Sequence, residues 1–245
     1  MVCRRRILRL LDAKSKDGGR GEWCRFLPWG YAEPITTRAG HFSYSPAMAG
    51  ESARFEQAMA MFDAANGEDP NLEAHEGVEV PKELLYARRM SAWLEKLTPE
   101  AGEPLRLAVR CQHLCRWTIP RGDYPAGRVG YRQWRSTLAE FHARKAGEIL
   151  RQVGYDPATV ERVQALVRKE KLKLDPEAQI LEDVACLVFL ENYFNEFILK
   201  HDETKIIDIV RKTWRKMSPR GRQAALALDL PERARTLVEK ALAGS

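Results

Sequence analysis

Residues 131–155, YRQWRSTLAEFHARKAGEILRQVGY, decide the fold because they have the apolar period of one long helix. Leu138, His142 and Ala146 recur at intervals of four residues, so they share one face of that helix. Gly154 follows the last residues of the pattern, in the position where a glycine ends a helix. We therefore expect a long helix that stops near Gly154 and buries the face carrying His142.

The chain after Ser52 continues with the same helical period and shows no sustained alternation. Ser52 is expected to cap the first helix, Pro81 and Pro104 to lie at first-turn positions, and Asp202 to cap a later helix. The expected helices cover 51–66, 81–97, 104–117, 131–155, 157–172, 179–199 and 204–217, with a short C-terminal pair around Leu226 and Leu237. The predicted class is all-α, a single compact multi-helix domain over residues 51–245.

Residues 1–50 show neither the helical period of about 3.6 residues nor the strand period of two, and they are rich in Gly, Pro and Arg. We therefore expect a disordered or irregular N-terminal extension. A new segment begins at Met48, and we hypothesise that residues 1–47 are an appendage or the product of a mis-assigned start codon. This extension carries nine Lys and Arg against four Asp and Glu, whereas the rest of the chain has 31 against 30. The formal charge of +6 therefore gives no support to a nucleic-acid partner.

Composition and missing motifs exclude several classes of protein. The longest apolar run, Val184 to Leu190, is far too short to cross a bilayer, so no membrane span is expected. Five cysteines, an odd number, without a convincing signal peptide predict reduced thiols and a cytoplasmic location. The sequence has no Gly-rich phosphate loop, Gly-x-Ser-x-Gly, His-Glu-x-x-His or Rossmann fingerprint.

The stretch CQHLCRWTIPR, residues 111–121, combines histidine, arginine and tryptophan at the end of an expected helix. On a helical wheel His113 lies opposite the apolar stripe, with Arg110 and Trp117 on its own face. This face is either solvated, with His113 near the helix dipole, or it lines an anion pocket to which Arg116 and Arg121 contribute. The cysteines are expected to pack, since Cys-x-x-x-Cys without a second pair is a weak zinc signal.

His142 and Asp183 are polar residues on apolar stripes, so each needs a buried partner. For His142 the alternatives are a hydrogen bond to a backbone carbonyl and ligation of a metal. Asp183 shares its stripe with Leu187 and Leu190, which predicts pairing, protonation or metal binding, unless it is simply a carboxylate near a helix N-terminus. Glu182 is the alternative carboxylate. Lys169, in the charge run RKEKLK, either binds phosphate or is solvated.

Segments spread along the chain resemble the family named for a domain of unknown function, DUF4202. The segments that carry the resemblance are RFEQAMAMFDAANGEDPN, PKELLYARRMSAWL, CQHLCRWTIPRGDYP, RVGYRQWR, LVRKEKLK, LEDVACLVFLENYF and RKTWRKMSPRG. The resemblance covers residue 52 to about residue 243.

A more distant resemblance is to the HD-domain metal-dependent phosphohydrolases, which are all-α proteins. AVRCQHLCRW is similar to their helix ending in a His-Asp pair, FHARKAGEILRQVGY to the segment opening with a later His, and LEDVACLVFL to the helix of the late Asp. The resemblance places Gln112 and His113 at the pair, His142 at the later His and Asp183 at the late Asp. Tyr86 stands where the family has its first His, and Lys169 falls near its fourth.

Because Tyr86 and Gln112 replace two ligands, a complete binuclear site is not expected. The resemblance implies at most one divalent metal (Mn, Fe or Mg), held by His113, His142 and Asp183. With phosphate held by Arg110, Arg116, Arg121 and Lys169, the chain would hydrolyse a phosphorylated small molecule or nucleotide. The alternatives are an HD-like domain that binds a nucleotide, another anion or a protein without catalysis, and an RNA-associated protein that uses Trp117, Trp134 and Trp214.

Overall fold

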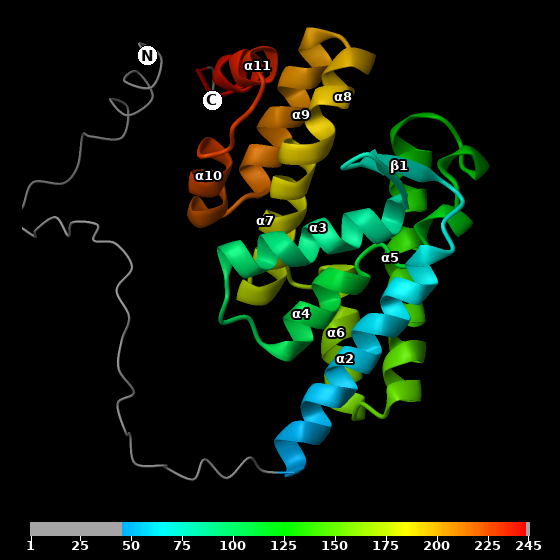
Figure 1. Ribbon diagram of the computed structural model, residues 1–245. Helices are drawn as coiled ribbons and strands as arrows, with labels where there is room; N and C mark the ends of the chain where they lie inside the picture. The colour runs from blue at the N-terminus through cyan, green and yellow to red at the C-terminus, as the bar shows by residue number, and fades with distance from the viewer. Residues whose placement is uncertain (1–45, 244–245) are drawn as a thin grey trace, which may run out of the picture. The chain divides into compact units, whose positions relative to one another are not determined.

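The computed structural model describes the main chain of residues 46–243 and the side chains of residues 52–243. This part of the chain is a helical domain with one small β-hairpin, so the predicted all-α class is confirmed (Figure 1). Most of the predicted N-terminal extension, residues 1–45, lies outside the described residues. The elements are α2 (Pro46–Gly67), β1 (Leu72–His75), β2 (Val78–Pro81), α3 (Lys82–Leu97), α4 (Glu103–Cys111), α5 (Gly127–Val153), α6 (Pro157–Arg168), α7 (Pro176–Val188), α8 (Phe194–Lys200), α9 (Glu203–Lys216), α10 (Pro219–Leu226) and α11 (Glu232–Ala243).

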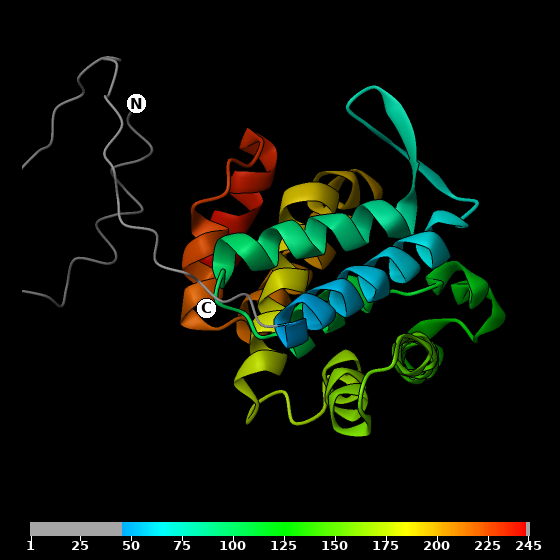
Figure 2. The same cartoon turned by 60° about the horizontal axis from the view of Figure 1, so that its bottom comes forward.

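The core forms where α3, α4, α6 and α7 pack on one another. Met90, Leu107, Leu166 and Leu187 come from these four helices and are fully buried. Burial of one such side chain contributes about 2 kcal/mol. Helix α2 lies beside α3 as a second layer over this core (Figure 2), and α9 and α11 pack together beside α7 and α8. None of the helices in the described part of the chain combines the length and the hydropathy that a membrane span requires.

The long helix α5 ends as predicted, at Gly154, whose φ of 90° favours glycine. Helix α6 follows at once, because Asp156 caps it by accepting from the amides of Ala158 and Thr159. The close approach of α5 and α6 depends on Gly147, where an added Cβ would lie 2.5 Å from Nε2 of Gln164.

Several predicted helix limits are wrong. Helix α5 begins at Gly127 instead of residue 131, α6 ends at Arg168 instead of residue 172, and the helix predicted over 179–199 is divided into α7 and α8 by the π-helical turn Phe189–Tyr193. Helix α2 begins at Pro46, so Ser52 lies inside it and does not cap it. Helix α4 ends at Cys111 instead of continuing to Trp117, and Cys115 adopts a left-handed conformation with φ of 53°. The helical wheel that placed His113 on one face with Arg110 and Trp117 therefore does not describe the structure.

The β-hairpin was missed by the sequence interpretation. Its two-residue turn is Glu76-Gly77, with φ of 50° and 83°, which fits a type I′ turn. The loop before the hairpin fixes the start of α3, because the Glu83 amide donates to Oδ2 of Asp69 at 3.0 Å. The carbonyl of Asn71 accepts from the Lys82 amide at 2.8 Å. These bonds fix the first turn of α3 to the loop that precedes the hairpin.

Candidate functional site

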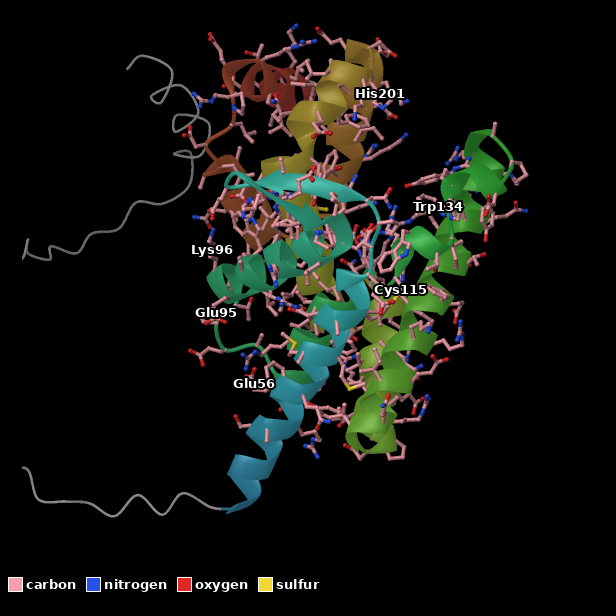
Figure 3. The ribbon with its side chains drawn as sticks, turned by 45° about the vertical axis from the view of Figure 1, so that its right-hand side comes forward. Glu56, Glu95, Lys96, Cys115, Trp134 and His201 are labelled. Carbon is pink, nitrogen blue, oxygen red and sulfur yellow. The ribbon has the colours of Figure 1, made fainter. Side chains whose placement is uncertain are left out.

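A cavity of about 750 Å³ lies between the start of α3, the turn after α4, the first half of α5, the second half of α7 and the ends of α6 and α9. Figure 3 shows Trp134 and Cys115 on this side of the domain, whereas Glu95 and Lys96 lie at the other end of α3. Charged and aromatic side chains dominate the wall. The cations are Lys82, Arg116, Arg121, Arg135, Lys169 and Lys216, the carboxylates are Asp69, Glu83 and Glu182, and the aromatic rings are Tyr86, Trp117, Tyr131, Trp134, Phe189 and Tyr193.

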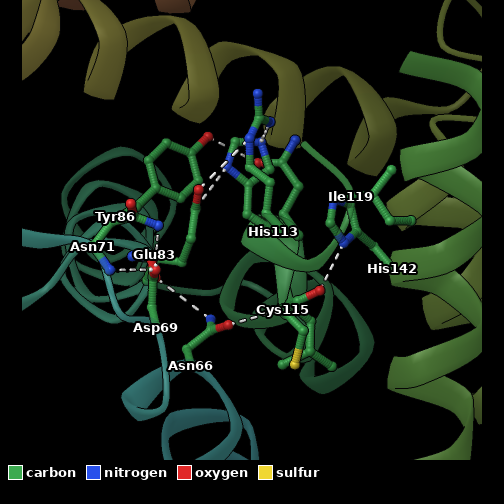
Figure 4. Close-up of polar contacts among 12 residues, drawn as sticks. Asn66, Asp69, Asn71, Glu83, Tyr86, His113, Cys115, Ile119 and His142 are labelled. Carbon is green, nitrogen blue, oxygen red and sulfur yellow. Dashed lines mark hydrogen bonds and ion pairs between the residues drawn. The ribbon is translucent and has the colours of Figure 1, made fainter. Parts of the chain in front are cut away.

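Three segments meet at His113, and their contacts fix the state of its ring (Figure 4). Its Nε2 lies 3.2 Å from Nη1 of Arg116, and its Nδ1 lies 3.2 Å from Oε2 of Glu83. Because a guanidinium only donates hydrogen bonds, Nε2 is the acceptor and Nδ1 carries the proton that is donated to Glu83. The ring also stacks on Tyr86 at a centroid distance of 4.1 Å. His113 is therefore a neutral imidazole in a fixed orientation.

Burial controls the charges of this group. It raises the pKa of Glu83 to about 7, although the nearby Arg116 acts in the opposite direction. It also holds the pKa of His113 well below its usual value, and the positive charges of Arg116, Arg135 and Lys169 add to this effect. The cavity thus contains a carboxyl group that changes protonation state near neutral pH.

A second charged group joins the ends of α6 and α9. The Glu182 carboxylate is buried, accepts from the Lys169 ammonium and lies 3.5 Å from Nζ of Lys216. Burial alone would raise the pKa of Glu182, but the two lysines outweigh it and the pKa lies below its usual value. Burial lowers the pKa of Lys169, against the effect of Glu182. Lys169 has φ of 57°, an unusual conformation for a residue other than glycine.

Trp134 and Arg121 shape the wall opposite α7. The indole N–H of Trp134 donates to the carbonyl of Ile119 at 2.9 Å, and the Arg116 guanidinium lies over its ring at 4.8 Å. Arg121 lines the cavity, but its guanidinium donates to the carbonyls of Tyr124 and Pro125 at 2.8 Å each. Arg121 therefore holds its own loop together.

Gln112 and Tyr86, the two positions at which the HD-domain resemblance predicted replaced ligands, meet in the cavity wall. The Tyr86 hydroxyl donates to Oε1 of Gln112 at 3.2 Å. Gln112 is buried, and both residues line the cavity. The structure thus brings them together with His113.

His142 is a buried histidine bonded to a carbonyl, the first of the two alternatives. Its Nδ1 lies 2.8 Å from the carbonyl oxygen of Leu114 (Figure 4), and its ring centroid is 5.8 Å from that of His113. Burial lowers the pKa of His142 to about 3. Its Nε2 is buried and lacks a hydrogen-bond partner within the described part of the chain. A carbonyl on one nitrogen and a free lone pair on the other is also the arrangement of metal-ligating histidines.

Asp183 and Arg110 lie outside the cavity lining. Oδ1 of Asp183 accepts from the Ser218 amide at 2.8 Å, and the Ser218 hydroxyl binds the other carboxylate oxygen. Arg110 binds both carboxylate oxygens of Asp63, at 2.7 and 2.5 Å. Lys169, Glu182, Arg116, Arg121 and Trp117 do line the cavity, as do Tyr86, Gln112 and His113.

The residues of the predicted metal site do not form one ligand set in this geometry. Nε2 of His113 accepts from Arg116, and the Asp183 carboxylate is bound to Ser218. Across residues 52–243, no group of three or more His, Cys, Asp and Glu side chains is arranged to hold a metal ion. The divalent metal stays a prediction, and the function proposed below does not depend on it.

Sequence interpretation missed Glu83, Arg135 and Lys216. Glu83 precedes Tyr86 by three residues on the stripe of α3, and this spacing could have revealed it. Arg135 follows Trp134 directly, in a helix already singled out for His142. No local pattern marks Lys216, because its place in the wall depends on how α9 packs.

The model of the family Domain of unknown function (DUF4202) matches residues 56–238, so the chain belongs to that family. The match includes every cavity residue named above. No curated protein and no solved structure matches the chain. The HD-domain resemblance gains no support from these comparisons.

Proposed function

We propose that this protein binds a phosphorylated small molecule in the cavity, through cations supplied by separate segments. The single observation that carries the proposal is the convergence of Arg116, Arg135, Lys169 and Lys216 on one open cavity. Together with Lys82 and Arg121, the six cations of the wall exceed its three carboxylates. A cavity with excess positive charge favours a ligand with two or more negative charges.

The cations keep donors for a ligand. An ammonium has three N–H groups, and the contacts of Lys169 within the domain use one, to Glu182. The side chain of Arg135 forms no ion pair or hydrogen bond with any other described residue, although it lines the cavity. Its charge lowers the pKa of Arg116 and Lys169, which places it in their electrostatic environment. Phosphate oxygens would satisfy these donors and reduce the repulsion between the cations.

Calorimetric titration of the wild-type protein with pyrophosphate and nucleoside monophosphates tests the proposal. We expect Arg135→Met and Lys216→Met to weaken binding about tenfold each, since each removes one charge-assisted contact. Arg132→Met and Lys212→Met are matched controls, because they remove a cation from the same helices outside the cavity lining. Equal effects of the cavity and control variants, or no binding at all, would reject the proposal.

Hydrolysis of the bound phosphate ester is the second candidate function. The observation that favours it is Glu83, a cavity carboxyl whose pKa of about 7 suits proton transfer at neutral pH. Phosphate release is measured with and without added Mn²⁺, Fe²⁺ or Mg²⁺. We expect Glu83→Gln to abolish release while the compound still binds; release at the wild-type rate by this variant would exclude Glu83 as the acid or base.

A further inference from the structure

Trp117 is an aromatic side chain of the cavity wall for which residues 52–243 supply no side-chain partner. It is half-buried in the turn Arg116–Thr118. By comparison, the indole N–H of Trp93 donates to Glu191 at 2.6 Å, and that of Trp134 donates to a backbone carbonyl. Within residues 52–243, Trp117 has no hydrogen bond, ring stacking or cation contact.

The position of Trp117 in the chain ties it to the anion site. It follows Arg116 directly, and both residues line the cavity. Arg116 is held by His113 at 3.2 Å and lies over Trp134 at 4.8 Å, so its guanidinium is fixed inside the wall. A phosphate bound at Arg116 would leave the rest of the ligand next to the free face of the Trp117 indole.

We infer that the ligand is a nucleoside phosphate whose planar base stacks on Trp117. This inference rests on the proposed function and adds the ligand class. A sugar phosphate would satisfy the cations but would leave the indole of Trp117 without a partner. The cavity volume of about 750 Å³ lies in the range of roughly 300–1,000 Å³ typical of small-molecule sites, which leaves room for a base beside the phosphate.

The test compares ligands that differ in one part. Wild-type protein is titrated with AMP, GMP, CMP and UMP, with ribose 5-phosphate, which has no base, and with adenosine, which has no phosphate. Stacking of a base on an aromatic side chain strengthens binding by roughly 5- to 150-fold. We therefore expect at least one nucleotide to bind about tenfold or more tightly than ribose 5-phosphate.

Variants at Trp117 separate stacking from phosphate binding. Trp117→Leu should bring the affinity for the nucleotide down to that for ribose 5-phosphate and leave ribose 5-phosphate unaffected. Trp117→Phe keeps a ring and should retain most of the affinity, which also controls for misfolding of the leucine variant. Quenching of tryptophan fluorescence by the nucleotide should be reduced in both variants.

Four results would overturn the inference, and they can be told apart. Equal binding of nucleotides and ribose 5-phosphate to the wild type, or equal weakening of both by Trp117→Leu, leaves the phosphate site in place and removes the base from it. If adenosine, which has no phosphate, binds as tightly as AMP, then the base determines recognition and the phosphate does not. No binding of any phosphorylated compound would reject the proposed function together with the inference.

Discussion

Replacement of Asp183 by alanine should destabilise the domain by about 3 kcal/mol without affecting the cavity. The side chain is buried and joins α7 to α10, because both of its oxygens accept hydrogen bonds from Ser218. Hydrogen bonds to a charged group contribute about 1.5–3 kcal/mol each, and water reaches the part-buried Ser218, so the lower figure applies to each of its two bonds. A third bond, from Nε2 of Gln179 at 3.0 Å, is not added, because Gln179 lies on the same helix and also donates to the Lys216 carbonyl. A domain of this size loses about 3 °C of Tm per kcal/mol, so the Tm should fall by about 9 °C.

Gly221 provides an independent check at the same place. Its amide donates to the Ser218 hydroxyl at 3.1 Å, and an added Cβ would lie 2.6 Å from Cγ of Asp183. Gly221→Ala should therefore cost about 1–3 kcal/mol by overpacking. In the Asp183→Ala background the new methyl group enters vacated space, so the double variant should be more stable than the sum of the single changes predicts.

Urea unfolding followed by circular dichroism measures these differences, and calorimetric titration measures binding in the same samples. Asp208→Ala is the control, because this exposed carboxylate on α9 pairs only with Lys212 among the described residues. A loss below about 0.5 kcal/mol for Asp183→Ala, the ordinary range of surface substitutions, would refute the structural role assigned to the carboxylate. So would additive effects at positions 183 and 221.

Three further predictions concern pH, the backbone and the metal. The pKa of Glu83 is raised from 4.5 to about 7 in the folded protein, so its contribution to stability is fully present below pH 4.5 and is lost as the pH rises through 7. The difference in unfolding free energy between wild type and Glu83→Gln should therefore change by about 3 kcal/mol across this window, and a pH-independent difference would exclude the shift. Lys171 is exposed and has φ of 51°, a conformation that strains residues other than glycine, so Lys171→Gly should raise the unfolding free energy by about 1 kcal/mol. Thermal unfolding measures the change, and a lower Tm for the variant than for the wild type would contradict this prediction. Because Asp183 is bound to Ser218, elemental analysis should find the same metal content in Asp183→Asn as in the wild type, and loss of a near-stoichiometric metal in this variant would instead place Asp183 at the metal.

Local signals in the sequence were sufficient for most of the fold. The apolar period and the glycine that follows it predicted the end of α5 at Gly154. Asp202 caps α9 as predicted, by accepting from the Lys205 amide. The end of α4 could not be predicted in this way, because Cys115 takes a left-handed conformation that normally favours glycine. Tertiary contact with α2 supports it: the Cys115 amide donates to Oδ1 of Asn66 at 2.9 Å.

The candidate site was predicted only in part, because local sequence signals mark some of its residues and tertiary packing supplies the others. His113, Arg116 and Trp117 stood out because they lie together in one short stretch. Glu83 and Lys216 come from distant segments, and only packing of α3 and α9 brings them to the cavity. The position of Asp183 on the apolar stripe of a helical wheel also does not tell whether its carboxylate binds a metal or, as here, the residue that caps another helix.

The backbone adopts an unusual conformation beside two of the cavity cations. Two of the non-glycine residues with positive φ, Cys115 and Lys169, lie directly before or at a cavity cation, and each such conformation costs roughly 1 kcal/mol. Asn66 holds the first in place and Glu182 pairs with the second, so buried polar groups maintain both conformations. Lys169 also ends α6, because its amide donates to the carbonyls of Ala165 and Leu166. The contacts that maintain these two conformations therefore also place Arg116 and Lys169 in the cavity wall.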